Sequence, residues 1–342
     1  LSTIGGVGMW SVVVVLPAMQ AEFGVDRGEA SLPYTLTMLG FAAGGVITGK
    51  LADRFGITTA IIVSALALGL GYVAVGNAAS LWQAAIAHGV LIGAGTSATF
   101  APLMADISHW FRRRRGIAVT IAAAGNYLAG TFWPPVVQHF TAADGWRATY
   151  IGIGVFCMVT MIPLSLLLRA RIDAHHTAAA TAEAAKRQAA LPLSPNALLI
   201  LLFCAGICCC VAMSMPQVHI VAYCSDLGYG VARGADMLSL MLGLGIVSRI
   251  GSGFIADRIG GVRTLIFGSV MQGVALLLYL FFDSMFSLYV ISGLFGLFQG
   301  GIVPMYAIIV REYFPAKEAG SRLGFVIMGT ILGMALGGWM SG

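Results

Sequence analysis

Long apolar runs alternate with short polar connections along the whole chain. Residues 55–105 contain no Asp, Glu, Lys or Arg, and a polar segment at 76–80 divides them into two apolar runs.

 A membrane-spanning helix needs about 20 apolar residues, so this stretch predicts two spans. Breaking the chain in the same way at charged and turn-forming segments predicts eleven spanning helices. The predicted spans cover residues 1–20, 31–50, 57–76, 81–105, 116–139, 147–168, 196–223, 235–255, 263–282, 286–310 and 322–341.

One short sequence occurs twice, each time between two apolar runs. Residues 49–56 read GKLADRFG, and residues 253–260 read GFIADRIG. The same offset of 204 residues relates four further pairs of glycines, which are Gly24 and Gly228, Gly89 and Gly293, Gly116 and Gly320, and Gly125 and Gly329. The chain is therefore internally duplicated. Two parallel membrane repeats can enclose a site at their interface and move about it, which favours a transporter.

An odd number of spans does not divide into two equal halves. The chain begins within one apolar run and stops directly after another, so we expect that the ends are trimmed and that a twelfth helix is missing. The resulting division has an N-terminal bundle of six helices at 1–169, a polar linker at 170–195 and a truncated C-terminal bundle at 196–342. The linker is expected to be mobile or partly helical.

Composition indicates that these helices lie in a lipid bilayer, and the distribution of charge indicates their orientation in it. Hydrophobic residues make up 58% of the chain and charged residues 10%, as expected for an all-α polytopic membrane protein. Of the 19 Lys and Arg residues, fifteen lie on the side of the duplicated turns, three lie on the opposite side, and Arg249 lies within a span. Because basic residues collect in cytoplasmic loops, the turns, the N-terminus and the linker are predicted to be cytoplasmic. The composition, which is rich in Ala and Arg, favours a bacterial inner (plasma) membrane as the bilayer.

Several other classes of protein lack support in the sequence. There is no P-loop, zinc-protease helix or nucleophile elbow, so we expect no enzyme activity and no cofactor. The six cysteines lack the spacing of a metal site and are interpreted as packing residues. The run Arg112–Arg115 lies between two spans, where it would bind lipid headgroups and not nucleic acid. Without a nucleotide site, transport must be driven by a substrate or ion gradient.

The motifs taken together resemble those of the major facilitator superfamily. The resemblance is carried by twelve helices arranged as six plus six and by the duplicated Gly-x-x-x-Asp-Arg-x-Gly turn after the second and eighth. Four further motifs narrow it to the branch that contains bacterial monocarboxylate transporters and oxalate:formate antiporters: WFRRRRG at 110–116, GWR at 145–147, Leu16-Pro17 and RIGSG at 249–253. The resemblance covers the whole chain. It implies the major facilitator fold, with two six-helix bundles, and transport by alternating access.

The duplicated turn supplies four candidate gating residues. Its glycines allow a sharp reversal and close helix approach. Asp53 with Arg54, and Asp257 with Arg258, can pair across helices or cap a helix end. In the family that the chain resembles, this motif governs the switch between outward-facing and inward-facing states, and that role is carried over to these residues. The alternative is that the turn only fixes topology and anchors the protein in the membrane.

Arg249 is the leading candidate for substrate binding. It lies within the eighth apolar run, where a charge is costly and is treated as functional by default. Its helical neighbours Gly245, Ser252 and Gly253 are small, and no Asp or Glu lies within one turn. A substrate carboxylate could form a bidentate pair with its guanidinium, and the resemblance implies that an Arg at this place binds the substrate anion. Alternatively, the side chain extends to the membrane interface and supports the neighbouring turn.

Two departures from the family pattern shape the choice of substrate. Oxalate-type members have a Lys in the eleventh helix, whereas residues 323–341 contain none, so a monocarboxylate is favoured over a dicarboxylate. Proton-coupled members place an Asp where this chain has Gly245, which leaves the proton-coupling residue unassigned. His219 is the best remaining titratable candidate, because a His changes charge near physiological pH. It could equally be structural, and His88 is a weaker candidate.

Uncharged polar residues inside spans can line a pathway or join helices. Asn126 and Tyr127 in the fifth predicted helix, and Gln299 and Tyr306 in the tenth, belong to helices that line the cavity in the family that the chain resembles. They complete the candidate substrate-binding set.

The sequence therefore predicts a secondary transporter of small organic anions, such as lactate, pyruvate or formate, by proton symport or anion exchange. Its partners would be the substrate anion, protons or a counter-anion, and the lipid bilayer. Two alternatives are efflux of neutral or amphipathic compounds, for which Arg249 would be dispensable, and a membrane substrate sensor that binds without transporting.

Overall fold

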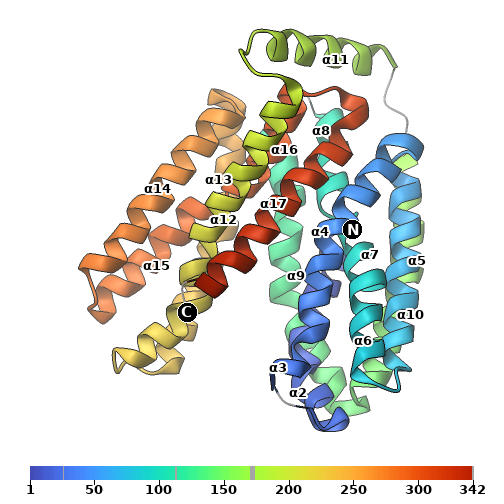
Figure 1. Ribbon diagram of the computed structural model, residues 1–342, viewed down its shortest axis with the longest axis vertical. Coiled ribbons are helices and arrows are strands. Elements are labelled where there is room, and N and C mark those ends of the chain that lie inside the picture. Colours follow the sequence, from blue (N-terminus) through green and yellow to red (C-terminus); the bar gives the residue numbers. More distant parts are fainter. Residues whose placement is uncertain (26, 112–113, 170–173, 341–342) are drawn as a thin grey trace. The chain divides into compact units, whose positions relative to one another are not determined.

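The computed structural model describes residues 1–25, 27–111, 114–169 and 174–340. These residues form helices joined by short turns, with no strand among them (Figure 1). The elements in chain order are α1 (Ser2–Gly5), α2 (Val7–Phe23), α3 (Arg27–Ala30), α4 (Leu32–Phe55), α5 (Ile57–Gly76), α6 (Leu81–Ala87), the π-helix η1 (His88–Gly93), α7 (Ala94–Ser97), α8 (Ala101–Trp110), α9 (Arg115–Asp144), α10 (Trp146–Leu166), η2 (Leu167–Arg169), α11 (Ala174–Ala189), α12 (Pro195–Asp226), α13 (Val231–Ile259), α14 (Gly261–Phe281), α15 (Met285–Gln299), α16 (Ile302–Tyr313), η3 (Ala316–Glu318) and α17 (Ala319–Met340).

Nine segments of the described chain are long and apolar enough to cross a membrane, and each coincides with a predicted span. The first predicted span corresponds to a shorter apolar helix, Ser2–Leu16. The fifth falls in α9, which is not among the nine. Helix α11 lies within the predicted linker. The nine segments are Leu32–Phe55, Ile57–Gly76, Leu81–Trp110, Trp146–Arg169, Pro195–Ile220, Asp236–Ile259, Gly261–Phe281, Met285–Tyr313 and Ala319–Gly337.

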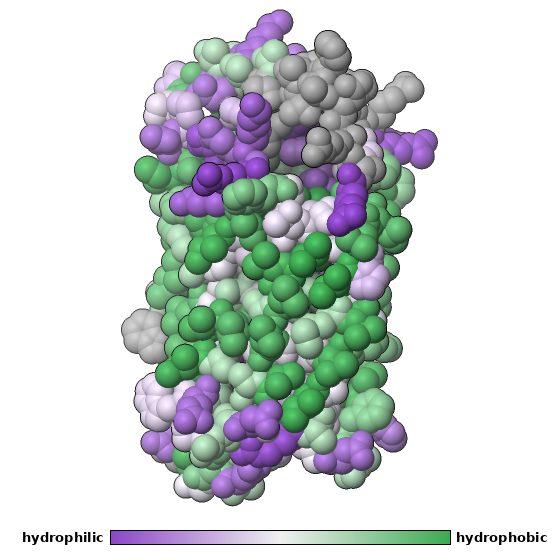
Figure 2. Space-filling model, turned by 90° about the vertical axis from the view of Figure 1, so that its right-hand side faces the viewer, coloured by the Kyte–Doolittle hydropathy of each residue, from purple (hydrophilic) through white to green (hydrophobic). Residues whose placement is uncertain are grey.

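The surface of these helices is suited to lipid. Figure 2 shows one face on which hydrophobic residues fill the middle and hydrophilic residues gather toward both ends. Large apolar side chains are exposed along α5 and α10, among them Leu70, at 56% exposure, and Val159, at 66%. A soluble monomer rarely exposes so much apolar surface. A lipid environment removes the free-energy cost of exposing apolar side chains to water, because acyl chains surround them instead.

Contacts along the chain define two compact units. The first unit comprises Leu1–Asp106, Gly125–Ala180 and Pro315–Met328, and the second comprises Ile107–Ala124, Thr181–Phe314 and Gly329–Gly342. In the first unit α5 packs against α10 and α4 packs against η1 (Figure 1). In the second, α13 packs against α12 and α15, and α14 packs against α15 and α16. Helices α9 and α17 each contribute residues to both units.

The duplicated sequence adopts the same turn twice. Gly56 ends α4 and begins α5, and Gly260 ends α13 and begins α14; both have φ near +88°. Their N–H groups donate to the carbonyls of Ala52 and Ala256, respectively. A side chain at such a φ would be strained, which explains why glycine occupies both positions.

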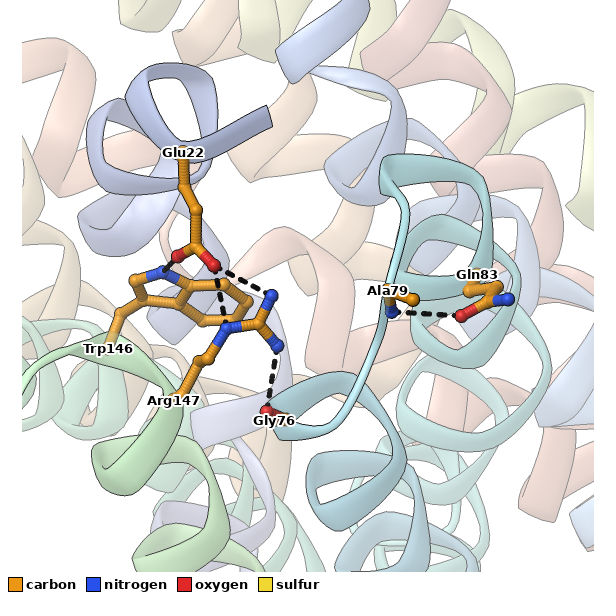
Figure 3. Close-up of polar contacts among 6 residues, drawn as sticks. All are labelled: Glu22, Gly76, Ala79, Gln83, Trp146 and Arg147. Atoms are coloured by element: carbon orange, nitrogen blue, oxygen red, sulfur yellow. Dashed lines mark hydrogen bonds and ion pairs between the residues drawn. The ribbon is translucent and has the colours of Figure 1, made fainter. Parts of the chain in front are cut away.

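The duplication extends to helix starts that the sequence comparison did not single out. Ser80 is the N-cap of α6, where its hydroxyl accepts a hydrogen bond from the N–H of Gln83, and Ser284, 204 residues later, caps α15 through the N–H of Ser287. The Gln83 side chain also accepts from the N–H of Ala79, at 2.9 Å (Figure 3). Each cap satisfies a backbone donor that the helix itself leaves unpaired.

Three segments of the first unit meet at Glu22 (Figure 3). Its carboxylate accepts hydrogen bonds from Trp146 Nε1, at 2.5 Å, and from Arg147 Nε, at 2.8 Å. Arg147 also donates through Nη1 to the carbonyl of Gly76, at 2.9 Å, and its guanidinium lies 4.5 Å from the centre of the Trp146 ring. The end of α2, the end of α5 and the start of α10 are therefore tied together by one charge pair.

The interactions of Glu22 make the stability of the fold depend on pH. Burial by itself raises the pKa of Glu22, but hydrogen bonds from Arg147 and Trp146 and the charge of Arg147 outweigh it, so the pKa lies below its usual value. A carboxylate with a lowered pKa in the folded state stabilises the fold above the pKa of the unfolded state, about 4.3, and loses this contribution as the pH falls through the folded pKa.

We expect Glu22→Gln to lower the stability of the detergent-solubilised protein by about 1 kcal/mol at neutral pH, since both partners are partly exposed. The difference from wild type should shrink as the pH falls below 4. Thermal unfolding measured across this range checks both expectations. Glu183→Gln, which breaks an exposed pair with Arg187 in α11, is the matched control and should change little. Equal loss of stability for Glu22→Gln at acid and neutral pH would contradict the assignment.

Candidate functional site

Asp53 caps the start of a helix that lies far away in the sequence. Its Oδ1 accepts a hydrogen bond from the N–H of Gly320, at 2.9 Å, and its Oδ2 accepts one from the N–H of Ser321, at 2.8 Å. These are the second and third residues of α17, whose N–H groups have no partner within the helix. The positive end of the helix dipole favours the carboxylate at this point.

Asp257 makes the same interaction at the start of α9. Its Oδ1 accepts from the N–H of Gly116, at 2.6 Å, and its Oδ2 from the N–H of Ile117, at 3.3 Å. Every residue of this pair lies 204 positions from its counterpart in the first pair. Each Asp comes from one repeat, and the helix that it caps comes from the other.

The glycine that opens each copy of the turn sequence makes this contact possible. A Cβ atom on Gly49 would collide with the carbonyl oxygen of Gly320, and one on Gly253 would collide with Thr120 Oγ1 and lie 2.8 Å from the carbonyl oxygen of Gly116. No side chain fits in either place. The motif therefore combines a small residue for close approach with an acid, four residues later, for the cap.

The two arginines of the motif are placed differently from the acids. Arg54 and Arg258 are both exposed, and the guanidinium of Arg54 lies 5.2 Å from the centre of the Phe55 ring. The sequence allowed Asp53 and Asp257 either to pair with an arginine across helices or to cap a helix end, and both acids cap a helix.

Arg249 lies in the middle of a span and is buried. The span Asp236–Ile259 continues through the duplicated turn sequence, so Arg249 is ten residues, or about 15 Å, from its end. The side chain is 4% exposed. It donates through Nε to the carbonyl of Gly300, at 3.0 Å, and through Nη1 to the carbonyl of Ala123, at 2.8 Å. This geometry does not match a side chain that extends to the membrane interface.

The partner of Arg249 is a break in a spanning segment. Gly300 and Gly301 separate α15 from α16 within the span Met285–Tyr313. Arg249 binds the carbonyl of Gly300, and the neighbouring Ser248 accepts from the N–H of Gly301, at 3.2 Å. Backbone groups freed by a break must be satisfied at membrane depth, and α13 supplies both partners. The two carbonyls bound by Arg249 are neutral, so neither offsets its charge.

The first repeat contains an interruption at a similar place. In the span Leu81–Trp110, residues 98–100 separate α7 from α8. Gly300 is the repeat equivalent of Thr96, which lies two residues before this interruption. Interrupted spans in corresponding positions of two repeats are a good indicator of a transporter binding site.

Three other predicted site residues belong to the second unit. Gln299 is buried beside the break, and its Oε1 accepts from Gln217 Nε2, at 2.9 Å. His219 lies two residues after Gln217 on α12 and is partly buried. Tyr306 is buried on α16 within hydrogen-bonding range of Cys209. The second unit thus gathers these residues on the helices next to Arg249.

Asn126 and Tyr127 belong to the first unit. Asn126 Nδ2 lies 3.8 Å from the sulfur of Met9 on α2, and both α9 residues are partly buried. They lie on the same helix as Ala123, whose carbonyl Arg249 binds.

Sequence reasoning missed three features of the site. Gln217 gave no signal, because its partner Gln299 is far away in the chain. Ser248 is an ordinary serine until the break that it satisfies is seen. Gly116 and Gly320 were noticed as equivalent positions of the repeat, and this was the only signal that they receive the two acids.

The comparisons with known proteins agree with this architecture. A family model described as Major Facilitator Superfamily matches residues 1–282 and 250–342. The chain is 24% identical to the MFS-type transporter pynF of Aspergillus niger, over 86% of this chain and 68% of that protein. It is 26% identical to monocarboxylate transporter 13 of Bos taurus, over 87% of this chain and 70% of that protein.

A solved structure has the same fold. The human organic anion transporter MFSD10 (TETRAN) matches with a TM-score of 0.75 and 14% identity, over 99% of this chain and 90% of that chain. The two matched ranges together cover residues 1–342, and the relatives are transporters and not enzymes. The chain therefore belongs to the major facilitator superfamily, with the fold of that family, and is a multi-pass membrane transporter.

Proposed function

We propose that this transporter carries small organic anions, and monocarboxylates in particular, by alternating access coupled to proton symport or anion exchange. The observation that carries the proposal is Arg249, a buried guanidinium held at mid-span by two neutral carbonyls. A positive charge fixed at mid-span attracts an anion, and a planar guanidinium suits a carboxylate. The likeness to monocarboxylate transporter 13 and to a human organic anion transporter supports the same substrate class.

The other candidate residues complete the proposed site. Gln299 lies next to the helix break at Gly300, whose carbonyl Arg249 binds. The Nε2 atom of Gln299 has no hydrogen-bond partner among the described residues. An amide donor of this kind can hold the second oxygen of a carboxylate or a neighbouring substituent. Tyr306 and His219 come from the helices beside it. Asn126 and Tyr127 of α9 are proposed as further substrate-binding residues on the basis of the sequence.

The paired caps provide the proposed gate. Asp53 and Asp257 each hold a helix start through two charge-assisted hydrogen bonds, and Arg54 and Arg258 sit next to them at the same turns. Breaking one cap exposes a carboxylate and two N–H groups, so each cap favours the state in which it forms. Because both turns are proposed to be cytoplasmic, formation of the caps would close the site on the cytoplasmic side, and breaking them would open it there.

The membrane and the topology follow the distribution of basic residues. We propose an inner (plasma) membrane location with the N-terminus, the duplicated turns and the linker 170–195 in the cytoplasm. The proposed division into bundles at 1–169 and 196–342 follows the two repeats.

Arg249→Ala should abolish saturable uptake of monocarboxylates into proteoliposomes, measured with a radiolabelled panel of lactate, pyruvate, formate and oxalate. Loss of one partner of a buried charge pair costs about 2–5 kcal/mol, which corresponds to a loss of apparent affinity of at least about thirtyfold. Arg249→Lys keeps the charge but not the planar fork, and it should retain partial affinity.

Arg233→Ala is the matched control, because Arg233 is on the same helix and 56% exposed beside Asp236. It should transport normally. Thermal unfolding of every variant separates loss of function from loss of fold. Uptake that survives in Arg249→Ala would contradict the anion site and favour transport of neutral compounds, while binding without accumulation in wild type would favour a sensor.

Asp53→Asn and Asp257→Asn should each slow transport while leaving substrate binding within a few-fold of wild type. Loss of a cap costs about 0.5–2 kcal/mol, which shifts a two-state equilibrium by about 2–30-fold. Initial rates of uptake and equilibrium binding of the same radiolabelled acid test this. Asp144→Asn, in an exposed position at the end of α9, is the control. Wild-type transport rates in both variants would show that the caps only stabilise the fold.

A further inference from the structure

A π-helix interrupts the fourth span and begins at a histidine. The segment η1 (His88–Gly93) lies between α6 and α7 inside the span Leu81–Trp110. π-Helical turns are rare and occur frequently at functional sites. His88 is fully buried. A Cβ atom on Gly40 of α4 would collide with the carbonyl of Gly89, so α4 approaches η1 closely at this point.

The neighbouring Thr37 determines which ring nitrogen of His88 carries the proton. Thr37 Oγ1 donates to the carbonyl of Pro33, at 2.7 Å. A hydroxyl has one hydrogen, so in its contact with His88 Nδ1, at 3.2 Å, it must accept. His88 is therefore assigned as the Nδ1–H tautomer in its neutral form. The other nitrogen, Nε2, presents a lone pair.

That lone pair has no hydrogen-bond partner among the described residues. The imidazole packs against the ring of Tyr150 of α10, and the two ring centres lie 5.6 Å apart. Tyr150 packs in turn on Tyr72 of α5, whose hydroxyl is bonded to Ser11 of α2, at 2.7 Å. A buried acceptor left unpaired is costly, and such groups in native proteins call for an explanation.

Helices α2, α4, α5, α6 and α7 pack against η1. The side chains described in contact with His88 are Thr37 of α4 and Tyr150 of α10, and Tyr150 in turn packs on Tyr72 of α5. The contacts described for His88 in residues 1–111 and 114–169 involve no acidic or basic side chain. A proton on Nε2 would therefore place one uncompensated positive charge in this part of the first unit.

We propose that Nε2 of His88 takes up and releases the proton that accompanies the transported anion. The inference rests on the proposed function and identifies the coupling residue that the sequence left unassigned. In the binding step the Nε2 lone pair takes a proton from a hydronium ion, whose O–H bond breaks to leave water, and the neutral imidazole becomes an imidazolium; release reverses the step. The Nδ1–H group keeps its hydrogen bond to Thr37 throughout. One proton offsets the single negative charge of a monocarboxylate, so the proton and the substrate together move no net charge across the membrane.

Two further buried hydroxyls extend the polar environment along the same elements. Ser64 Oγ on α5 and Thr96 Oγ1 on α7 have no hydrogen-bond partner among the described residues. Helices α5 and α7 pack against each other and against η1. Polar atoms of this kind can hold water in a state of the transport cycle that admits it.

The test separates proton coupling from substrate transport. Wild type and His88→Gln are reconstituted in proteoliposomes, and uptake of radiolabelled lactate is measured in two modes: accumulation driven by an imposed inward proton gradient, and counterflow with no gradient. If lactate is not carried, the panel acid with the highest wild-type uptake replaces it. We expect His88→Gln to lose proton-driven accumulation at least tenfold and to keep counterflow. His139→Gln, an exposed histidine on α9, should leave both unchanged.

Each other result overturns the inference. Proton-driven accumulation retained in His88→Gln would remove the residue from coupling, and loss of both modes would mean that His88 is needed for transport itself or for folding. Wild-type uptake that ignores the proton gradient would leave the proposed anion transport standing and refute coupling at His88. If wild type carries no acid at all, the proposed function fails first.

A second variant keeps the imidazole and tests the assignment of its tautomer. Thr37→Val preserves the volume of the side chain but removes the acceptor for Nδ1–H, so the pH profile of proton-driven uptake should move. Thr37→Ser keeps the hydroxyl and should retain the wild-type profile. An unchanged profile in Thr37→Val would contradict the role of Nε2.

Discussion

A carboxylate at the edge of an apolar region must have its oxygens satisfied, and so must the N–H groups at the start of a helix. Asp53 and Asp257 meet both requirements with one contact each, because two carboxylate oxygens match two successive donors. The helix that each acid caps comes from the opposite repeat. The caps therefore cannot form unless both repeats are present. The other features of the motif surround these caps: glycines allow the helices to approach closely, Gly56 and Gly260 form the tight turns, and the arginines beside them are exposed.

The turns and helix caps occur in both repeats, whereas Arg249 and His88 each occur in only one. The turns, the serine caps of α6 and α15 and the two acid caps recur at the offset of 204. Arg249, by contrast, corresponds to Gly45, and His88 corresponds to Ser292, which is bonded to Tyr279 at 2.9 Å. One repeat has therefore acquired a buried cation and the other a buried imidazole on equivalent scaffolds. Such a pair is what a transporter of an anion with a proton would need, since the two ligands require different chemistry.

Breaks in the spanning helices connect this frame to its chemistry. A broken helix frees backbone groups that lipid cannot satisfy, so a neighbouring helix must supply partners. At Gly300 and Gly301 these partners are Arg249 and Ser248. This structural demand holds the guanidinium at mid-span. Support of the break is therefore compatible with the proposed binding of a substrate anion by the same side chain.

The sequence by itself determined the spans, because the cost of polar groups in lipid acts on every window of about 20 residues. It also determined the repeat, the glycines of the turns and the residue types able to bind an anion. Tertiary structure decided which backbone groups those residues meet. The partners of Asp53 and Arg249 lie far away in the chain, and no local pattern records them. The eighth predicted span ends at residue 255, whereas α13 continues to Ile259, because the polar residues of the turn sequence remain helical. The tautomer of His88 likewise depends on Thr37, which only the packing of α4 against η1 brings into contact with it.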